Sequence, residues 1–272
     1  MKQQQLNSSI TIFFSLLLAA CGGGGDASVT QPASSVAGGG VTVETTGATG
    51  STSNGGGVAG DSSGGSTSAD NSTINNNSSN SVASVTLGDC FTWTPGTKFN
   101  KSNDFKTLIV QETFEGQTAT GAADLRINDS RFSVLYQTIS GGAIHLLGLN
   151  QYDTTGAIKS KVVYSGGAQM PADMTPGQSV QMEYTTTSTT AATNAVTTAN
   201  VSSQFTFVGL EDLILGNRTF SNVCKVKAVE NGQIYVTWFA KGFGAIRSER
   251  QDAAGATISG SRVELTSVVA AP

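Results

Sequence analysis

The strongest local folding signal in the sequence is Val229-Glu230-Asn231-Gly232-Gln233-Ile234. Its central Asn-Gly pair lies between two apolar runs and is the preferred pair of a type I′ β-hairpin turn, because both residues accept positive φ angles. A two-residue turn at this point sets the register of the flanking strands. Glu230 then pairs with Gln233, and Cys224 pairs with Phe239. The sequence therefore predicts an antiparallel hairpin centred on this pair.

The two faces of this hairpin are both apolar. By alternation, one face carries Cys224, Val226, Ala228, Tyr235 and Phe239, and the other carries Lys225, Lys227, Val229, Ile234, Val236 and Trp238. A sheet with one solvated face has large apolar groups on only one side. Three explanations remain open: other elements cover the second face, the lysine stems lie over it, or it lines a pocket. On the third explanation, Ile234, Val236 and Trp238 are the predicted ligand-binding residues.

The remainder of residues 84–272 reads as one all-β domain. Short β-rich runs alternate with Gly, Asn, Asp and Pro turns, and we find no convincing helical period. Cys90–Trp93 is the expected first strand, and the Thr/Ala-rich stretch that ends near Thr198 is the expected tip of a mobile hairpin. We predict an antiparallel, curved sheet that forms a half-barrel or a sandwich of ten to twelve strands.

The N-terminal region ends in the motif Leu18-Ala19-Ala20-Cys21, which is followed directly by four glycines. This motif resembles the lipobox of bacterial lipoproteins, where signal peptidase cuts before the cysteine and the cysteine then carries palmitate-type acyl chains. The preceding apolar run of about ten residues suits a signal peptide over residues 1–20 and is too short to span a bilayer. The alternative is an ordinary secretory signal with a chance cysteine. The resemblance implies that Cys21 is lipidated, and Gly22 in place of Asp implies an outer-membrane destination.

Residues 21–83 have the composition of a tether. Beyond Cys21 they contain no lysine, arginine or aromatic residue, and Gly, Ser, Thr, Asn, Ala and Val predominate. Such a segment cannot bury enough apolar surface to offset its ordering entropy. We therefore expect a flexible spacer between the lipidated cysteine and the β domain.

The charge balance argues against a nucleic-acid partner. The tether holds four of the 19 acidic residues of the chain, and Lys2 belongs to the signal peptide, so the β domain holds 14 basic and 15 acidic residues. A nearly neutral domain offers no basic surface for nucleic acid. Membrane contact is expected through the lipid anchor.

The cysteines suggest a disulfide. Once Cys21 is assigned to the lipid, Cys90 and Cys224 remain, and an even remainder in an oxidising compartment predicts a disulfide. Two buried free thiols are the alternative. Two cysteines and a single histidine are too few for a metal site with this spacing, so no metal and no cofactor are expected.

Catalytic groups are sparse in the sequence. His145 is the only histidine and lies within a strand, and no Gly-x-Ser-x-Gly nucleophile elbow exists. Gly242-Phe243-Gly244 lacks the helix that a phosphate loop requires, and Glu211 and Asp212 point to opposite faces of a strand. We therefore expect no enzymatic activity, although a pair of carboxylates assembled from distant strands stays open.

Two segments resemble a known family. Gly209-Leu210-Glu211-Asp212, continuing through Leu215–Phe220 to Cys224-Lys225-Val226, and then Thr237–Arg247, resemble consecutive segments of uncharacterised bacterial outer-membrane lipoproteins with a periplasmic β domain. Some members are likened to the lipoprotein carrier LolA. The resemblance implies a cell-envelope location and a β fold. The family usually has Pro-Ala-Gly where this chain has Leu215-Gly216-Asn217, so the resemblance supports location and fold more than a carrier activity.

The sequence leads to two main functional hypotheses. The first is a lipid-anchored outer-membrane protein, facing the periplasm or the cell surface, whose β domain binds an acyl chain, a glycan or a protein without catalysis. The second is a structural or accessory envelope protein that acts through surface contacts and has no small ligand. An enzyme with a cross-strand acid site is a third and weaker hypothesis.

Overall fold

The computed structural model describes residues 84–272, and the predicted signal peptide, Cys21 and tether lie outside these residues. The described part contains thirteen strands and one short helix. The helix is α2 (Leu87–Cys90), and the strands are β1 (Lys98–Lys101), β2 (Lys106–Phe114), β3 (Gln117–Leu125), β4 (Arg131–Ser140), β5 (Ala143–Tyr152), β6 (Ile158–Ser165), β7 (Gln169–Pro171), β8 (Ser179–Thr190), β9 (Ala195–Leu215), β10 (Arg218–Glu230), β11 (Gln233–Ala240), β12 (Gly244–Gln251) and β13 (Val263–Ala270). The predicted all-β class is confirmed.

The Asn-Gly hairpin forms with the predicted register. Asn231 and Gly232 have φ angles of 50° and 74°, as a type I′ turn requires. In the β10–β11 ladder Glu230 lies opposite Gln233, and the pairing continues without a shift to Cys224 opposite Phe239. The turn chemistry therefore determines which side chains of these two strands share a face.

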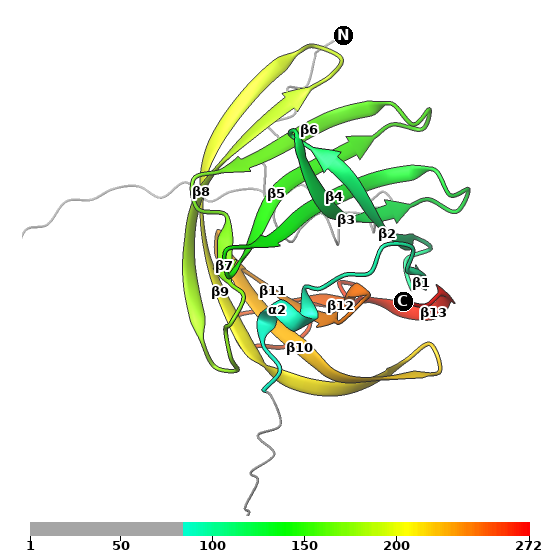
Figure 1. Ribbon diagram of the computed structural model, residues 1–272, viewed down its shortest axis with the longest axis vertical. Helices are drawn as coiled ribbons and strands as arrows, with labels where there is room; N and C mark the ends of the chain where they lie inside the picture. Colours follow the sequence, from blue (N-terminus) through cyan, green and yellow to red (C-terminus); the bar gives the residue numbers. More distant parts are fainter. Residues whose placement is uncertain (1–83) are drawn as a thin grey trace, which may run out of the picture. The chain divides into compact units, whose positions relative to one another are not determined.

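The named strands of residues 84–272 all pair in antiparallel fashion, and the two ends of the sheet meet. The strand order is β4-β3-β2-β1-β13-β12-β11-β10-β9-β8-β6-β5-β7, and β4 also pairs with β5. This additional pairing closes twelve strands into a barrel (Figure 1). The short β7 pairs with the first residues of β5, and β6 pairs with the later ones. Closure gives most backbone edges a partner.

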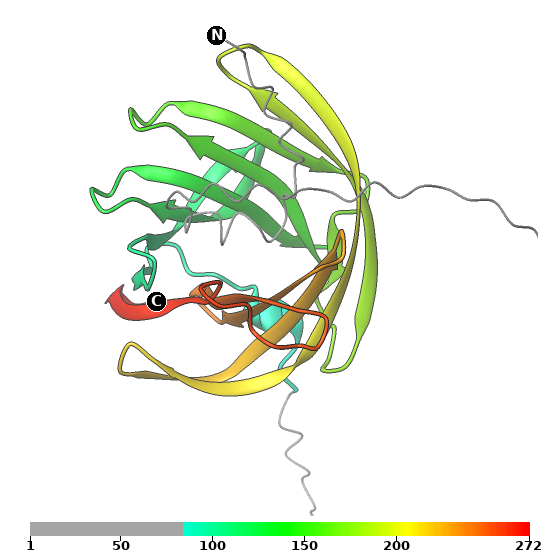
Figure 2. The same ribbon diagram turned by 180° about the vertical axis from the view of Figure 1, so that it is seen from behind.

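Bulges help the long strands to bend around the barrel. The register of β9 and β10 shifts between Phe220 and Val223 and again between Lys225 and Val226. Such shifts insert extra residues into one strand, and they bend it and increase its twist. Figure 2 shows the β9–β10 hairpin, drawn in yellow, as a strongly curved ribbon.

The main core fills the inside of this barrel. It collects side chains from β2 and from β4 to β11 around the ring, among them Ile144, Met182, Phe205 and Val226. The segment that precedes β1 contributes Leu87, Cys90, Phe91 and Trp93 to the same cluster. A barrel of this many strands is too wide for its own side chains to fill, so this segment supplies part of the missing core. In both views α2 lies within the outline of the ring (Figures 1 and 2).

Two smaller clusters form where long hairpins curl over neighbouring strands. At the far end of β9 and β10, Leu215, Phe220 and Val223 pack with residues of β11 to β13 and β1. At the far end of the β2–β3 hairpin, Phe114 stacks on Tyr136 of β4 with a centroid distance of 4.5 Å. These clusters explain why several strands are apolar on both faces.

One local expectation was wrong, and the strands of one hairpin are longer than expected. Cys90–Trp93 does not form a strand, because Thr86 and Asp89 make a capping box that starts α2 at Leu87. The Thr/Ala-rich stretch does contain the tip of the β8–β9 hairpin, but most of it is paired strand, since β8 continues to Thr190 and β9 begins at Ala195. β-Branched threonines are good strand residues, and their side chains add cross-strand hydrogen bonds such as Thr185 Oγ1 to Asn200 Oδ1, at 3.1 Å.

Candidate functional site

Three neighbouring strands bring two glutamines and a threonine into one row. Gln111 of β2 lies opposite Thr120 of β3, and Thr120 lies opposite Gln137 of β4. Directly opposed residues of antiparallel strands place their side chains on the same face, about 5 Å apart. Gln111 also shares a face with Ile109, which belongs to the main core. The row therefore lies on the inner face of the barrel.

The segment before β1 forms the opposite wall. Gln137 Nε2 donates a hydrogen bond to the carbonyl oxygen of Phe91, at 2.7 Å. The Phe91 ring stacks on Phe239 with a centroid distance of 4.3 Å, and its centroid lies 6.1 Å from that of Trp93. These contacts hold the two aromatic rings in place beside the row.

A cleft of about 320 Å³ lies between the row and this wall. Its lining consists of Phe91, Thr92, Trp93, Gln111, Thr118, Ala119, Thr120, Gln137, Thr138 and Ile139. Gln111, Thr118 and Ile139 are exposed at its open side, whereas Gln137 is only 1% exposed. The volume lies at the lower end of the range for small-molecule sites.

The lining of this cleft carries no charge. Apart from the Trp93 indole, its polar side chains are hydroxyls and amides, and each of these can both donate and accept hydrogen bonds. Such a lining can orient an uncharged ligand, but it supplies neither a general acid nor a general base.

Two buried polar atoms of the lining residues lack a partner within residues 84–272. Gln137 Oε1 is buried and accepts no hydrogen bond from the described residues. A buried acceptor without a partner is costly, and this oxygen belongs to a side chain that lines the cleft. The indole nitrogen of Trp93 also lacks a partner within residues 84–272, but its edge lies against Gly244.

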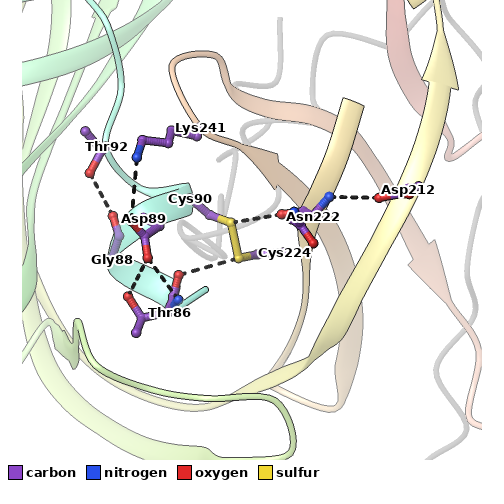
Figure 3. Close-up of a disulfide and its surroundings, with 9 residues drawn as sticks. All are labelled: Thr86, Gly88, Asp89, Cys90, Thr92, Asp212, Asn222, Cys224 and Lys241. Carbon is purple, nitrogen blue, oxygen red and sulfur yellow. Dashed lines mark hydrogen bonds and ion pairs between the residues drawn. A yellow bond between two sulfur atoms is a disulfide. The ribbon is translucent and has the colours of Figure 1, made fainter. Parts of the chain in front are cut away.

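A disulfide holds the aromatic wall in place. The structure contains the predicted Cys90–Cys224 disulfide, which joins the end of α2 to β10 (Figure 3). Asp89 accepts hydrogen bonds from the backbone and side chain of Thr86, both at 3.0 Å. The backbone bond from Thr86 is the largest contribution that lowers the pKa of the Asp89 carboxyl below its usual range. The carboxylate also lies 3.7 Å from Lys241 Nζ.

The three binding residues predicted on the β10–β11 hairpin lie elsewhere. Val236 and Trp238 are 2% and 4% exposed in the second core cluster, and Ile234 packs against it. The curled end of β9 and β10 and the Lys225 side chain cover this face; Lys225 Nζ lies 5.1 Å from the centre of the Trp238 ring. Of the three explanations that the sequence leaves open, cover by other elements and by a lysine accounts for the apolar face. A ligand role for these residues stays a prediction.

Trp238 is also fixed by a carboxylate. Its Nε1 donates to Glu211 Oε2 at 2.8 Å, and Lys225 Nζ donates to Glu211 Oε1 at the same distance. Burial raises the pKa of Glu211, but the hydrogen bonds from Lys225 and Trp238 outweigh it, so the pKa lies below its usual range. Asp212 instead accepts a hydrogen bond from the backbone of Asn222. The two adjacent acids therefore serve different structural contacts.

A second group of titratable residues is buried inside the barrel. Glu230 is 1% exposed and lies opposite Ser203 and Gln233 on the inner face. Burial, and then the charge of Glu230, raise the pKa of Tyr164 and Tyr184 far above the usual range, so both phenols stay protonated. None of these residues lines the cleft described above.

The single histidine and the possible metal ligands are the remaining candidates from the sequence. His145 lies on β5, with Nε2 3.2 Å from the carbonyl oxygen of Ser140. Within residues 84–272, no group of three or more His, Cys, Asp or Glu side chains is arranged to hold a metal ion. In this same part of the chain, no helix is both long and apolar enough to cross a bilayer.

Sequence reasoning missed Gln111, Thr120 and Gln137. Each lies in a β-rich run that holds further polar residues, such as Glu112 and Thr138, which is typical of a solvated strand face. Only the register of three strands shows that they form one inward-facing row. The available signal was the spacing of two residues between Ile109 and Gln111 and between Leu135 and Gln137, which puts each glutamine on the same strand face as an apolar residue.

No protein-family model and no curated protein matches this chain. A solved structure from Bacteroides fragilis, assigned as an exported protein with a YmcC-like fold, matches with a TM-score of 0.40 and 11% identity over 65% of this chain and 97% of that one. A structure from Parabacteroides distasonis, assigned as a lipoprotein, matches with a TM-score of 0.38 and 9% identity over 67% of this chain and 98% of that one. Both TM-scores and both sequence identities are too low for a function of either protein to be transferred to this chain.

Proposed function

We propose that this protein is a lipoprotein of the cell envelope, anchored in the outer membrane through Cys21, whose β-barrel domain binds a ligand without catalysis. The Leu18–Cys21 motif supports the anchor. Two or more acyl chains on one cysteine would hold the protein firmly at a membrane, and the tether would let the domain sample the space around it.

The observation that carries the binding role is the inner cleft. It combines a size suited to a small ligand with a buried acceptor, Gln137 Oε1, that the described residues leave without a partner. Its uncharged lining suits recognition and offers no residue for proton transfer. Binding without chemistry is therefore the use that fits this site best.

Two experiments test the two halves of this proposal. The Cys21→Ser variant should move from the membrane fraction to the soluble fraction, and its retention after an alkaline wash would overturn the anchor. Native mass spectrometry of the wild-type chain, released from detergent, should show an additional mass that denaturation removes. That mass would also distinguish an acyl chain from a glycan or a protein.

A second function is favoured by one surface feature. Val208, Leu210 and Ile214 of β9 are all exposed, with Ile214 at 76%. Exposed apolar side chains along one strand suit a protein contact, as in a structural or accessory envelope protein. A wild-type mass without any ligand, together with cross-links to another envelope protein that Ile214→Ser removes, would favour this function.

A further inference from the structure

We propose that the cleft between Phe91–Trp93 and the Gln111–Thr120–Gln137 row binds one unit of an uncharged, polyhydroxylated ligand, such as a neutral sugar residue. This inference rests on the proposed binding function and names its ligand class. Gln137 would take the deepest hydroxyl, and Gln111 and Thr120 would bind hydroxyls nearer to the opening.

The hydrogen-bonding character of the lining matches hydroxyl groups. A hydroxyl donates one hydrogen bond and accepts others, as do the threonines, and each glutamine side chain also offers both roles. Gln137 already uses Nε2 on the Phe91 carbonyl, which leaves Oε1 as the buried acceptor for a ligand O–H. The row places one such group on each of three neighbouring strands.

The lack of charge in the lining argues against ionic ligands. No Lys, Arg or His side chain lines the cleft, so a phosphate, sulfate or carboxylate would lose its hydration without a countercharge. An acyl chain fits no better, because it would leave the buried amide and the hydroxyls without partners. A neutral polar molecule avoids both costs.

The aromatic wall offers an apolar contact for the C–H groups of a sugar ring. Phe91 and Trp93 line the cleft with rings that are inclined by only 22° to each other. They are 3% and 7% exposed, so they meet a bound sugar over a small area while its hydroxyls reach the row. Because Gln111, Thr118 and Ile139 are exposed, the open side leaves room for the next unit of a longer glycan.

The test is saturation-transfer NMR on the full chain in detergent. The probes are glucose, galactose, mannose and N-acetylglucosamine, with glucuronate and decanoate as the charged and acyl probes. At least one neutral sugar should receive saturation, while glucuronate and decanoate should not. Gln111→Met and Thr120→Val should each lower the affinity for that sugar about two- to tenfold, which corresponds to the loss of one hydrogen bond.

Matched substitutions outside the cleft separate binding from folding. Gln204→Met and Thr219→Val remove the same groups from exposed positions on β9 and β10, and they should leave the affinity unchanged. Gln137→Met should abolish binding, but the Gln111 and Thr120 variants decide the question if that variant does not fold.

The contrary outcomes are distinct. If none of the four neutral sugars binds, or if the cleft and control variants bind a sugar equally well, the ligand class proposed for this cleft is wrong. A co-purifying acyl chain or protein in the native mass spectrum of the wild-type chain would overturn the sugar as the proposed ligand and would leave the binding function in place. A chain that binds no probe and carries no additional mass would overturn both.

Discussion

Removing the Cys90–Cys224 disulfide should destabilise the barrel by several kcal/mol. Both sulfurs are buried, and the bond joins the segment in front of β1 to β10 on the inner face of the sheet. Replacing both cysteines by alanine removes the crosslink while keeping small apolar side chains in the core. The barrel strands themselves do not include Cys90, so the native topology should persist.

The size of the effect follows from the length of the closed loop. The two cysteines are 134 positions apart, and the chain-entropy relation gives about 5 kcal/mol at 25 °C for a loop of this length. Measured losses in other proteins usually lie between about 2 and 5 kcal/mol. We therefore expect a loss of free energy of unfolding in this range for the double variant.

Urea unfolding of the full chain in detergent measures this loss. Wild-type protein that has been unfolded and refolded in reductant should have the same free energy of unfolding as the Cys90→Ala/Cys224→Ala variant. Wild-type protein that has met reductant only in its folded state should keep its free energy of unfolding, because both sulfurs are buried. A difference below about 1 kcal/mol, which the alanine substitutions alone could produce, would refute the reasoning. Ready thiol labelling of the two cysteines in unfolded, unreduced protein would show that the bond is absent.

Two further changes test the packing and the electrostatics of the barrel. Gly148→Ala should lower the free energy of unfolding by about 1–3 kcal/mol, because the new Cβ would lie 2.1 Å from the Val162 carbonyl oxygen at a φ of +145°. Gly209→Ala is the control, since no atom lies within 4 Å of the position of its Cβ. Equal denaturation midpoints for the two variants would contradict the prediction. Glu211→Gln should reduce stability at pH 7, and the deficit should shrink as the pH falls below about 4.3. The carboxyl pKa is lower in the folded state, since the hydrogen bonds that Glu211 accepts, including that from Lys225, outweigh burial. Its stabilisation is therefore complete above the unfolded pKa and is lost on acidification; a deficit in urea midpoint that stays constant from pH 7 to pH 3 would argue against it.

The sequence alone was informative wherever the cause is local. The Asn-Gly pair determines a turn through the φ angles of two residues, and a two-residue turn leaves one register for its strands. The all-β class follows from period-two alternation and frequent turn residues. The disulfide follows from the number of cysteines left in an oxidising compartment, and the structure contains it. The lipid anchor and the lack of enzymatic activity stay predictions.

Which faces of the strands lie inside the barrel, and what covers the other faces, depends on packing between distant segments. Alternation shows that Trp238 and Phe239 point in opposite directions, but it cannot show that the curled end of β9 and β10 covers Trp238. The closure of the barrel depends likewise on the pairing of β1 with β13, which places Lys98 opposite Ala270 from the two ends of the domain.

The cleft depends even more strongly on distant parts of the chain. Gln111, Thr120 and Gln137 are brought into one row by two strand registers, and the Phe91 wall reaches them only because its segment enters the barrel. Local preferences determine strands and turns, whereas a site of this kind arises from long-range pairing and from burial that must be shared among distant residues.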